Sequence, residues 1–273
     1  HVKDWDQLKD LMSETSLFDI EVKNPSISNL SEKFTIRDGY IQYGHGEIKD
    51  VGKDAISLIE KVVELEKHLG KSASEFTWYE FLILISQKVC KTAINNLILC
   101  GILDNTGVSR NRQLHEYNTL SALKTSKVKM KWIEENYKNY DNLLSLLEGL
   151  LETTVKVEKP KKKTKKKIEL PEEYHEEVES EAVNRDYEKI SSLVNSLKNP
   201  GKSLDDSQKN LYKIETELMG VAISADPIST KERLANIKCA AFNNGKGSNN
   251  LKFVVVVKSV KEKTVKEGKN SGR

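Results

Sequence analysis

Two adjacent runs of like charge in the middle of the sequence limit what the chain can fold into. Residues 159–167, KPKKKTKKK, hold seven lysines among nine residues, and residues 172–181, EEYHEEVESE, hold six glutamates among ten. Neither run has enough apolar side chains to offset the conformational entropy that is lost on ordering. We therefore expect a flexible linker over 156–185, with separately folded parts on either side of it.

Charge is also sorted along the rest of the chain. The net charge is +3, but residues 1–104 carry 12 Lys and Arg against 17 Asp and Glu, and residues 105–167 carry 15 against 7. Residues 168–229 carry 6 against 14, and residues 230–273 carry 11 against 3. One evenly charged surface would not give such blocks, so we expect tethered modules with different electrostatic partners.

Several classes of site and setting are not indicated. The longest apolar run, FLILI at 81–85, is far shorter than the roughly 20 residues that cross a bilayer, so no membrane span is expected. Cys90, Cys100 and Cys239 lack metal-ligand spacing and favour a reduced, intracellular setting. The five histidines show no metal spacing either, and we interpret His45 as structural rather than catalytic. We expect no catalytic or metal-binding residue in this segment.

Apolar side chains recur at helical spacing over much of the first 155 residues. They predict an amphipathic helix over residues 54–70. Thr77 precedes Glu80 by three residues, the spacing of a capping box, so a second helix should begin at about residue 78. A third helix follows a short break and should end at Gly101, a residue that readily adopts the left-handed conformation at a helix end.

Other segments predict shorter or later elements. We expect a short helix in WDQLKDLMSET (5–15), a strand around Tyr40, further helix over 113–155, a helix in SQKNLYKIETELMGV (207–221), and β-strands in KFVVVVKSVKEKTV (252–265).

The stretch KDVGK, residues 49–53, has the features of a phosphate-binding hairpin at the start of a helix. Gly52 has no Cβ to hold a phosphate away, and free N–H groups of a hairpin and a helix N-terminus point toward an anion. We expect the Val51 side chain to pack inward, while Lys49 and Lys53 supply charge. Such contacts would position a duplex without reading its sequence. The predicted DNA-binding residues are Lys49, Val51, Gly52, Lys53, Lys91, Arg110 and Arg112.

The order of the motifs resembles the C-family replicative DNA polymerases of bacteria, the DNA polymerase III alpha subunits. In that family V-x-P-x-I-N-x-S…F precedes I-x-(F/Y)-G-L-x-A-I-K-G-V-G, and here EVKNPSISNLSEKF precedes IQYGHGEIKDVG. FTWYEFLILISQKVCKTAINNLILCGILD is similar to the family's F-x-S-x-x-D-F…V-N-K-R-A-I-E-A-L-I-x-A-G-A-F-D. IETELMGVAISADPI resembles E-x-E-x-L-G-x-Y-L-S-x-H-P-L, and FVVVVKSVKEKTVKEGKNSG resembles the first strands of the family's OB fold.

The chain departs from the family pattern at four places. Asp50 stands where the family has the hairpin glycine, and His45 stands where a leucine follows the Tyr/Phe-Gly pair. Ser28 and Cys90 stand where the family has asparagines. A carboxylate at Asp50 repels a phosphate, and the departures together suggest a divergent, viral lineage.

The resemblance implies a mainly α fold: a tandem helix-hairpin-helix unit with further helices, a charged linker and the first strands of an OB-fold β-barrel. The implied segments are 1–72, the end of the fingers region leading into the first hairpin; 73–155, the second helix-hairpin-helix unit and following helices; 156–185, the linker; 186–229, a connecting helical segment; and 230–273, an incomplete OB-fold start.

By the same resemblance, the chain is the C-terminal segment of a DNA-directed DNA polymerase that binds duplex primer-template DNA through its phosphates. Catalytic Mg²⁺ and the dNTP would be bound by carboxylates of the parent enzyme outside this segment. A glutamine-led motif binds the sliding clamp in this family, and Gln208, Leu211 and Tyr212 are the candidates here. Other replisome subunits are possible partners, and the implied setting is the cytoplasm of a bacterial or phage-infected cell.

Two other interpretations stay open. One is a non-enzymatic helix-hairpin-helix and OB-fold nucleic-acid-binding accessory protein, and the other is a helical scaffold without DNA contact. An upstream reading frame with clustered Asp residues on palm-like strands would favour the polymerase, and a start codon just before His1 would favour the accessory protein.

Overall fold

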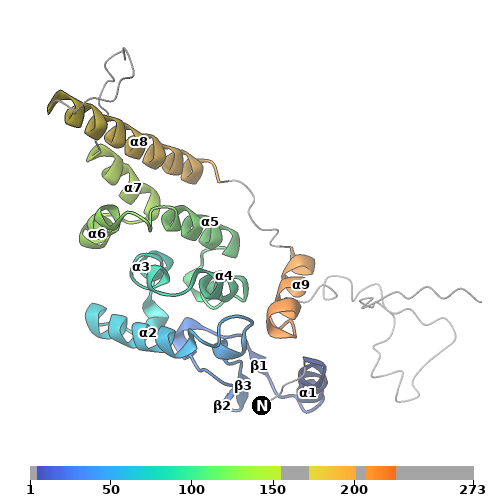
Figure 1. Cartoon of the computed structure of the whole chain (residues 1–273). Coiled ribbons are helices and arrows are strands. Elements are labelled where there is room, and N and C mark those ends of the chain that lie inside the picture. Colours follow the sequence, from blue (N-terminus) through green and yellow to red (C-terminus); the bar gives the residue numbers. More distant parts are fainter. Residues whose placement is uncertain (1–4, 155–171, 201–206, 226–273) are drawn as a thin grey trace, which may run out of the picture. The chain divides into compact units, whose positions relative to one another are not determined.

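The computed structural model of the chain describes residues 5–154, 172–200 and 207–225 (Figure 1). The chain divides into two compact units, residues 1–224 and 225–273. Apart from Ala225, the described residues belong to the first unit. The predicted OB-fold strands in 230–273 lie outside the described residues, as does the lysine run at 159–167.

A helix and a small sheet form the N-terminal part, which confirms the expected short helix and the strand at Tyr40. The elements are α1 (Trp5–Leu17), β1 (Val22–Lys23), β2 (Thr35–Arg37) and β3 (Tyr40–Gln42). The strand order is β1-β3-β2, with β1 parallel and β2 antiparallel to β3. Asp38 and Gly39, which join β2 to β3, both have positive φ, as the favoured two-residue hairpin turns require.

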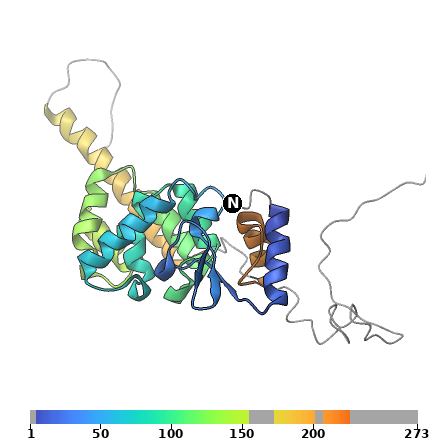
Figure 2. The same ribbon diagram turned by 90° about the horizontal axis from the view of Figure 1, so that it is seen from below.

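Six helices follow, and they are packed into one core. They are α2 (Ala55–Leu69), α3 (Trp78–Leu84), α4 (Lys91–Leu99), α5 (Arg110–Ser121), α6 (Lys127–Asn136) and α7 (Leu143–Glu152). The first three agree with the predicted helices, and the helical stretch expected over 113–155 is divided into α5, α6 and α7. Figure 2 shows the same helices from below.

Local sequence signals account for the ends of α3 and α4. The Thr77 hydroxyl accepts a hydrogen bond from the Glu80 N–H at 3.2 Å, and the Glu80 carboxylate accepts one from the Thr77 N–H at 2.9 Å, so the predicted capping box is present. Gly101 has φ 78° after α4, and a Cβ there would also collide with the Arg110 side chain. Both signals are local in sequence, which explains why they could be read in advance.

The apolar pattern of α2 fixes which of its faces is buried. Leu58, Val62 and Leu65 lie in the core, whereas Ile56 and Val63 are exposed. Burying each large aliphatic side chain contributes about 1.5–3 kcal/mol to folding. The buried row therefore contributes to packing α2 into the core, where α2 contacts the 3₁₀ turns His45–Glu47 and Ala73–Glu75.

The helix α8 (Glu172–Lys198) corrects the predicted linker. The prediction of a flexible segment was wrong for residues 172–185, which are helical. Glutamate is a good helix former and is favourable near a helix N-terminus, so a glutamate-rich run can form a helix without burying a whole face. Ile190 and Val194 near the other end are buried, where α8 lies along α7 and α5 (Figures 1 and 2).

The last described helix is α9 (Gln208–Met219), which confirms the helix predicted over 207–221. It packs against α4 and is followed by Gly220 in the left-handed conformation. Across the residues that the structure describes, no helix combines the length and apolar character needed to cross a membrane.

Candidate nucleic-acid interface

Residues 48–53, which we call the first hairpin, lead into α2. The element that precedes the first hairpin is a 3₁₀ turn, His45–Glu47, rather than an α-helix. Val51 is fully buried, as predicted, and it anchors the hairpin to the core. Lys49, Gly52 and Lys53 are exposed residues.

The backbone of the first hairpin leaves several N–H groups without a partner. The Val51 N–H donates to the Ile48 carbonyl at 3.1 Å, and the Asp54 N–H donates to the Val51 carbonyl at 2.8 Å. Within the described part of the chain, the amides of Asp50, Gly52 and Lys53 have no such acceptor. These donors sit at the N-terminus of α2, where a helix dipole also favours an anion. The arrangement can accept a phosphate oxygen.

Asp50 has a left-handed conformation, with φ 62°. This is the position where the C-family sequences have the hairpin glycine. Asp tolerates this region better than most residues, but glycine adopts it at lower cost. The turn therefore has the left-handed backbone conformation that a glycine at position 50 would adopt. Asp50 also adds a negative charge beside the free amides.

Contacts from two distant helices fix the first hairpin. The Lys49 N–H donates to the Leu218 carbonyl of α9 at 2.9 Å, and the Asn96 side chain of α4 donates to the Lys49 carbonyl at 2.7 Å. The Tyr43 hydroxyl donates to the Met219 carbonyl at 2.9 Å, and burial raises the pKa of Tyr43, so the hydroxyl keeps its proton. The hairpin is thus held in one conformation before any ligand binds.

The glycines before the hairpin serve packing within the protein. A Cβ on Gly44 would collide with the backbone of Lys33, and one on Gly46 would lie 2.6 Å from the Glu32 carbonyl oxygen. A Cβ on Gly52 would lie 3.2 Å from the Gly46 carbonyl oxygen. The close approach of these segments explains why the stretch is rich in glycine, independently of any DNA contact.

His45 is structural, as we interpreted it from the sequence. Its ring is buried; Nδ1 accepts from the Ser31 N–H at 3.1 Å, and Nε2 donates to the Ala55 carbonyl at 3.0 Å. This pairing requires the neutral ring. Burial lowers the pKa of His45, although the two hydrogen bonds and the charge of Glu32 oppose that effect.

A second turn, residues 85–90, leads into α4. Val89 is buried, whereas Lys88 and Cys90 are exposed, and so is the predicted contact residue Lys91. The N-cap residue Cys90 forms no side-chain cap, and among the described residues the Cys90 and Lys91 amides have no acceptor. Lys91 and Asn96 are about 7.5 Å apart along the axis of α4. The second turn therefore lies near the first hairpin, which Asn96 contacts.

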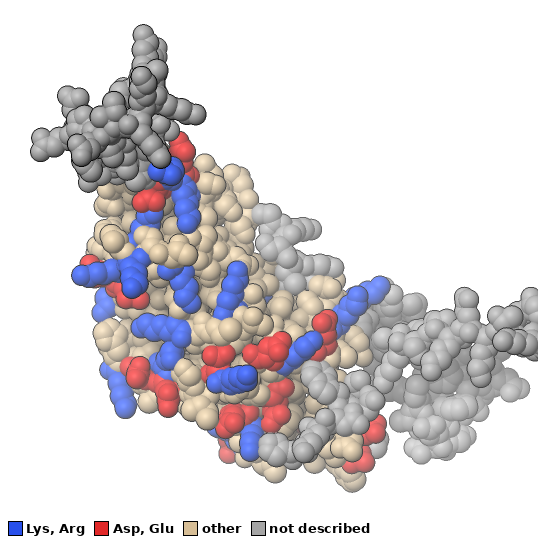
Figure 3. Space-filling view, in the orientation of Figure 1, with Lys and Arg blue, Asp and Glu red and all other residues tan. Residues whose placement is uncertain are grey.

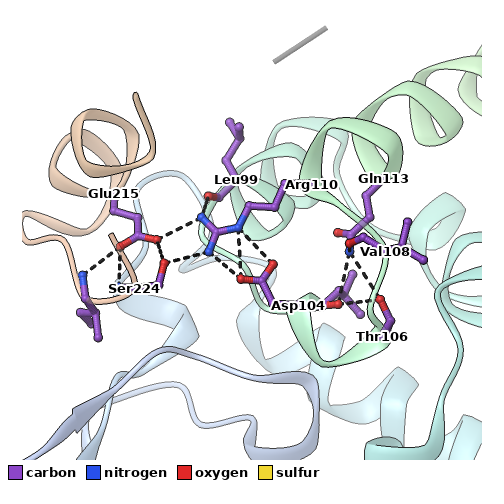
Figure 4. Close-up of polar contacts among 10 residues, drawn as sticks. Leu99, Asp104, Thr106, Val108, Arg110, Gln113, Glu215 and Ser224 are labelled. Atoms are coloured by element: carbon purple, nitrogen blue, oxygen red, sulfur yellow. Dashed lines mark hydrogen bonds and ion pairs between the residues drawn. The ribbon is translucent and has the colours of Figure 1, made fainter. Parts of the chain in front are cut away.

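Arg110 is not available to DNA, which corrects its prediction as a contact residue. Its side chain is only 6% exposed. The guanidinium group pairs with Asp104, with an Nη2–Oδ2 distance of 2.6 Å, and with Glu215, with an Nη1–Oε1 distance of 3.0 Å (Figure 4). It also donates to the Leu99 carbonyl and to the Ser224 hydroxyl.

The ion pairs keep Arg110 charged inside the protein. Burial alone would lower its pKa, but the hydrogen bonds and charges of Asp104 and Glu215 outweigh burial and raise it. Arg110 thus joins the start of α5 to α9 and is a structural cation. The sequence did not reveal this role, because Glu215 lies 105 positions away.

Arg112 differs from Arg110, because its side chain is 62% exposed. Its Nε donates to Glu116 at 2.7 Å, and Glu116 also accepts from the Trp78 indole at 2.7 Å. The exposed guanidinium can still reach solvent, so a DNA contact by Arg112 remains a prediction.

The expected basic surface of residues 105–167 is largely outside the described residues. Residues 105–154 carry seven Lys and Arg against six Asp and Glu, a net +1, and the remaining positive charge belongs to 155–167. In Figure 3, Lys and Arg are spread over the face shown, while Asp and Glu gather toward its lower part, where α2 and the sheet lie. The face shown is therefore not uniformly basic.

Two further predictions can be placed but not tested. The clamp-binding candidates Gln208, Leu211 and Tyr212 lie in the first turns of α9, with Leu211 and Tyr212 half-buried. For metal binding, the described residues include no group of three or more His, Cys, Asp or Glu that could hold an ion. The C-family resemblance implies that Mg²⁺ is bound by the parent enzyme outside this segment, so no chemical step is assigned to the described residues.

Comparison with known proteins agrees with this geometry. Residues 19–113 match the family model of a helix-hairpin-helix motif, which spans the sheet, the first hairpin, the second turn and the start of α5. The match covers less than half of the 273 residues. A search of curated proteins found no match. The motif indicates nucleic-acid binding as the class of function.

Three residues important to this interface were missed from the sequence. Asn96 carried a usable signal, because it is a polar residue on the buried apolar face of α4. Tyr43 and Glu215 carried none, since each meets a partner more than 100 positions away.

Proposed function

We propose that this chain binds the backbone of duplex DNA without reading its sequence. The observation that carries the proposal is the first hairpin, residues 48–53, whose unpaired amides belong to exposed residues just before α2, flanked by the side chains of Lys49 and Lys53. Backbone N–H groups fixed in this way bind phosphate oxygens, and phosphate contacts position a protein on DNA without sequence information.

The proposed partner site extends from the first hairpin to the second turn. Lys91 and Asn96 belong to the same short helix, α4, so this helix carries the free amides of the second turn and is bonded through Asn96 to the first hairpin. Two such points of contact would orient a duplex, whereas one alone would leave it free to rotate.

A salt series with fluorescence anisotropy tests the proposal. The full 273-residue chain is titrated onto two unrelated duplexes and onto a single strand. We expect equal affinity for the two duplexes, weaker binding to the single strand, and a linear fall of log K with log salt. Marked preference for one duplex sequence, or no duplex binding, would contradict it.

A matched pair of variants locates the contact. Lys53→Glu reverses a charge beside the first turn of α2, and Lys67→Glu makes the same change in the last turn of the same helix. We expect Lys53→Glu to weaken duplex binding several-fold and Lys67→Glu to have little effect. Equal effects would show that only net charge matters.

At a finer level, we propose that this DNA-binding segment is part of a C-family DNA-directed DNA polymerase in a cytoplasmic replisome. The support is the order of four sequence motifs, including EVKNPSISNLSEKF before IQYGHGEIKDVG. Mg²⁺, dNTP and the sliding clamp would then be ligands and partners of the parent enzyme. The upstream reading frame tests this level: acidic residues on palm-like strands support a polymerase, and a start codon immediately before His1 contradicts it.

A further inference from the structure

We propose that Glu215 is a positioning residue for DNA binding, acting through residues 207–224, which we call the α9 segment. Glu215 holds the α9 segment in place, and the α9 segment in turn holds the first hairpin in the conformation that receives a phosphate. This inference rests on the proposed function.

The Glu215 carboxylate is fully buried and all of its contacts order the α9 segment. One oxygen pairs with Arg110 at 3.0 Å and accepts the Ser224 hydroxyl, and the other accepts the Ile223 and Ser224 N–H groups at 2.8 and 3.0 Å (Figure 4). The carboxylate thus folds the chain back after Gly220 and fastens it to α5.

The end of α9 contacts the first hairpin and the preceding Tyr43 about one helical turn beyond Glu215. The Leu218 carbonyl accepts the Lys49 N–H, and the Met219 carbonyl accepts the Tyr43 hydroxyl, each at 2.9 Å. Because a helix turn is rigid, a shift at Glu215 moves both acceptors together. Lys49 directly precedes Asp50, the first residue with an unpaired amide.

Loss of these bonds would change the first hairpin before it changes the core. The Lys49 N–H would lose its acceptor, and the residues that follow would sample more conformations. Binding to phosphate would then have to restore the lost order, which lowers affinity without removing a charged contact.

The test compares the wild-type chain with Glu215→Gln, which keeps the size of the side chain and removes its charge. Two quantities are measured: amide hydrogen exchange in residues 48–53, and affinity for a short duplex over a salt series. We expect exchange of the Lys49 amide, which is bonded to the Leu218 carbonyl, to become about tenfold faster and the affinity to fall about fivefold. We also expect an unchanged slope of log K against log salt, since no phosphate contact is removed.

Glu116→Gln is the matched control for exchange. Glu116 is also a buried carboxylate paired with an arginine, but its partners are Arg112 and Trp78 rather than the α9 segment. We expect it to leave exchange in residues 48–53 unchanged. Tyr43→Phe removes only the bond to Met219 and provides a milder second variant if Glu215→Gln does not fold.

The outcomes separate the two proposals. Absence of duplex binding by the wild-type chain overturns the proposed function. Duplex binding by the wild-type chain, together with unchanged hairpin exchange or unchanged affinity in Glu215→Gln and Tyr43→Phe, overturns the positioning role of Glu215 alone.

Discussion

The first hairpin and the second turn offer free amides at a helix start in different ways. The first hairpin contains a left-handed residue, Asp50, and its backbone is held from both sides by Asn96 and Leu218. The second turn presents the N-terminus of α4 with two lysines, Lys88 and Lys91, and no acidic residue between them. Geometry dominates in the first case and charge in the second.

Because of this difference, we expect duplex affinity at the two sites to depend differently on salt concentration. Hydrogen bonds from fixed amides act at short range, whereas attraction between exposed lysines and phosphates is screened and depends on counterion release. Both sites carry lysines and should be salt-dependent, but the share of affinity that survives at high salt should be larger at the first hairpin than at the second turn.

The largest effect is expected for Lys49→Glu combined with Lys53→Glu. The two new carboxylates would stand beside the amides of the first hairpin, so duplex affinity should fall at least about tenfold, and the salt slope should decrease by about 2. Lys61→Glu combined with Lys67→Glu, on the same helix, is the control of equal charge. An equal loss of duplex affinity in the control would show that the effect comes from net charge and not from a contact at the first hairpin.

A smaller loss is expected for Lys88→Glu combined with Lys91→Glu at the second turn. Affinity should fall about fivefold at low salt and much less at high salt, because this contact depends on charge. Anisotropy titrations at both salt concentrations measure the difference. If the loss of duplex affinity exceeded that of Lys49→Glu combined with Lys53→Glu, the second turn and not the first hairpin would be the main contact.

Asp50→Gly should stabilise the protein. Glycine adopts φ 62° more readily than aspartate, and we expect a gain of about 0.5–1 kcal/mol in the free energy of unfolding. Urea denaturation measures the change. Asp50→Ala removes the same charge but keeps a Cβ, so it should lower the free energy of unfolding. A higher free energy of unfolding in both variants would show that charge rather than backbone conformation is responsible.

Asp50→Asn should tighten duplex binding about twofold to threefold, since it removes a negative charge beside the free amides and keeps a side chain that tolerates positive φ. Asp38→Asn is the matched control, because Asp38 also has positive φ and is exposed, but lies in the turn between β2 and β3. If both variants gain equally, the effect belongs to net charge and not to the first hairpin.

The smallest effect is a pH dependence specific to the approach to the first hairpin. The pKa of His45 is lowered in the folded state, so the unfolded state binds more protons below about pH 6.5 and stability falls as the pH decreases through that value. His45→Gln should flatten this part of the curve. Urea denaturation between pH 7.5 and 5.5 measures it, and parallel curves for the two proteins would refute the assignment.

The sequence predicted features that depend on neighbours in the chain. The Thr77–Glu80 capping box, the end of α4 at Gly101 and the inward packing of Val51 were all correct. Each depends on spacing over a few residues or on a backbone preference of one residue type.

Features that depend on distant neighbours were missed or misassigned. Arg110 was expected to contact DNA because it follows the second turn in the sequence, but its partner Glu215 comes from another part of the chain. Residues 172–185 of α8 were assigned to the linker, because a charged run was expected to bury too little apolar surface to become ordered. A helix needs only part of one face to be buried.

The bond between Tyr43 and Met219 joins residues 176 positions apart, and it has a consequence for how the protein is made. Closing so long a loop is entropically costly, so this contact should form late in folding. On the ribosome, residues 43–53 emerge long before α9 does. During synthesis, the first hairpin would therefore stay incomplete until nearly all of the first compact unit had been translated.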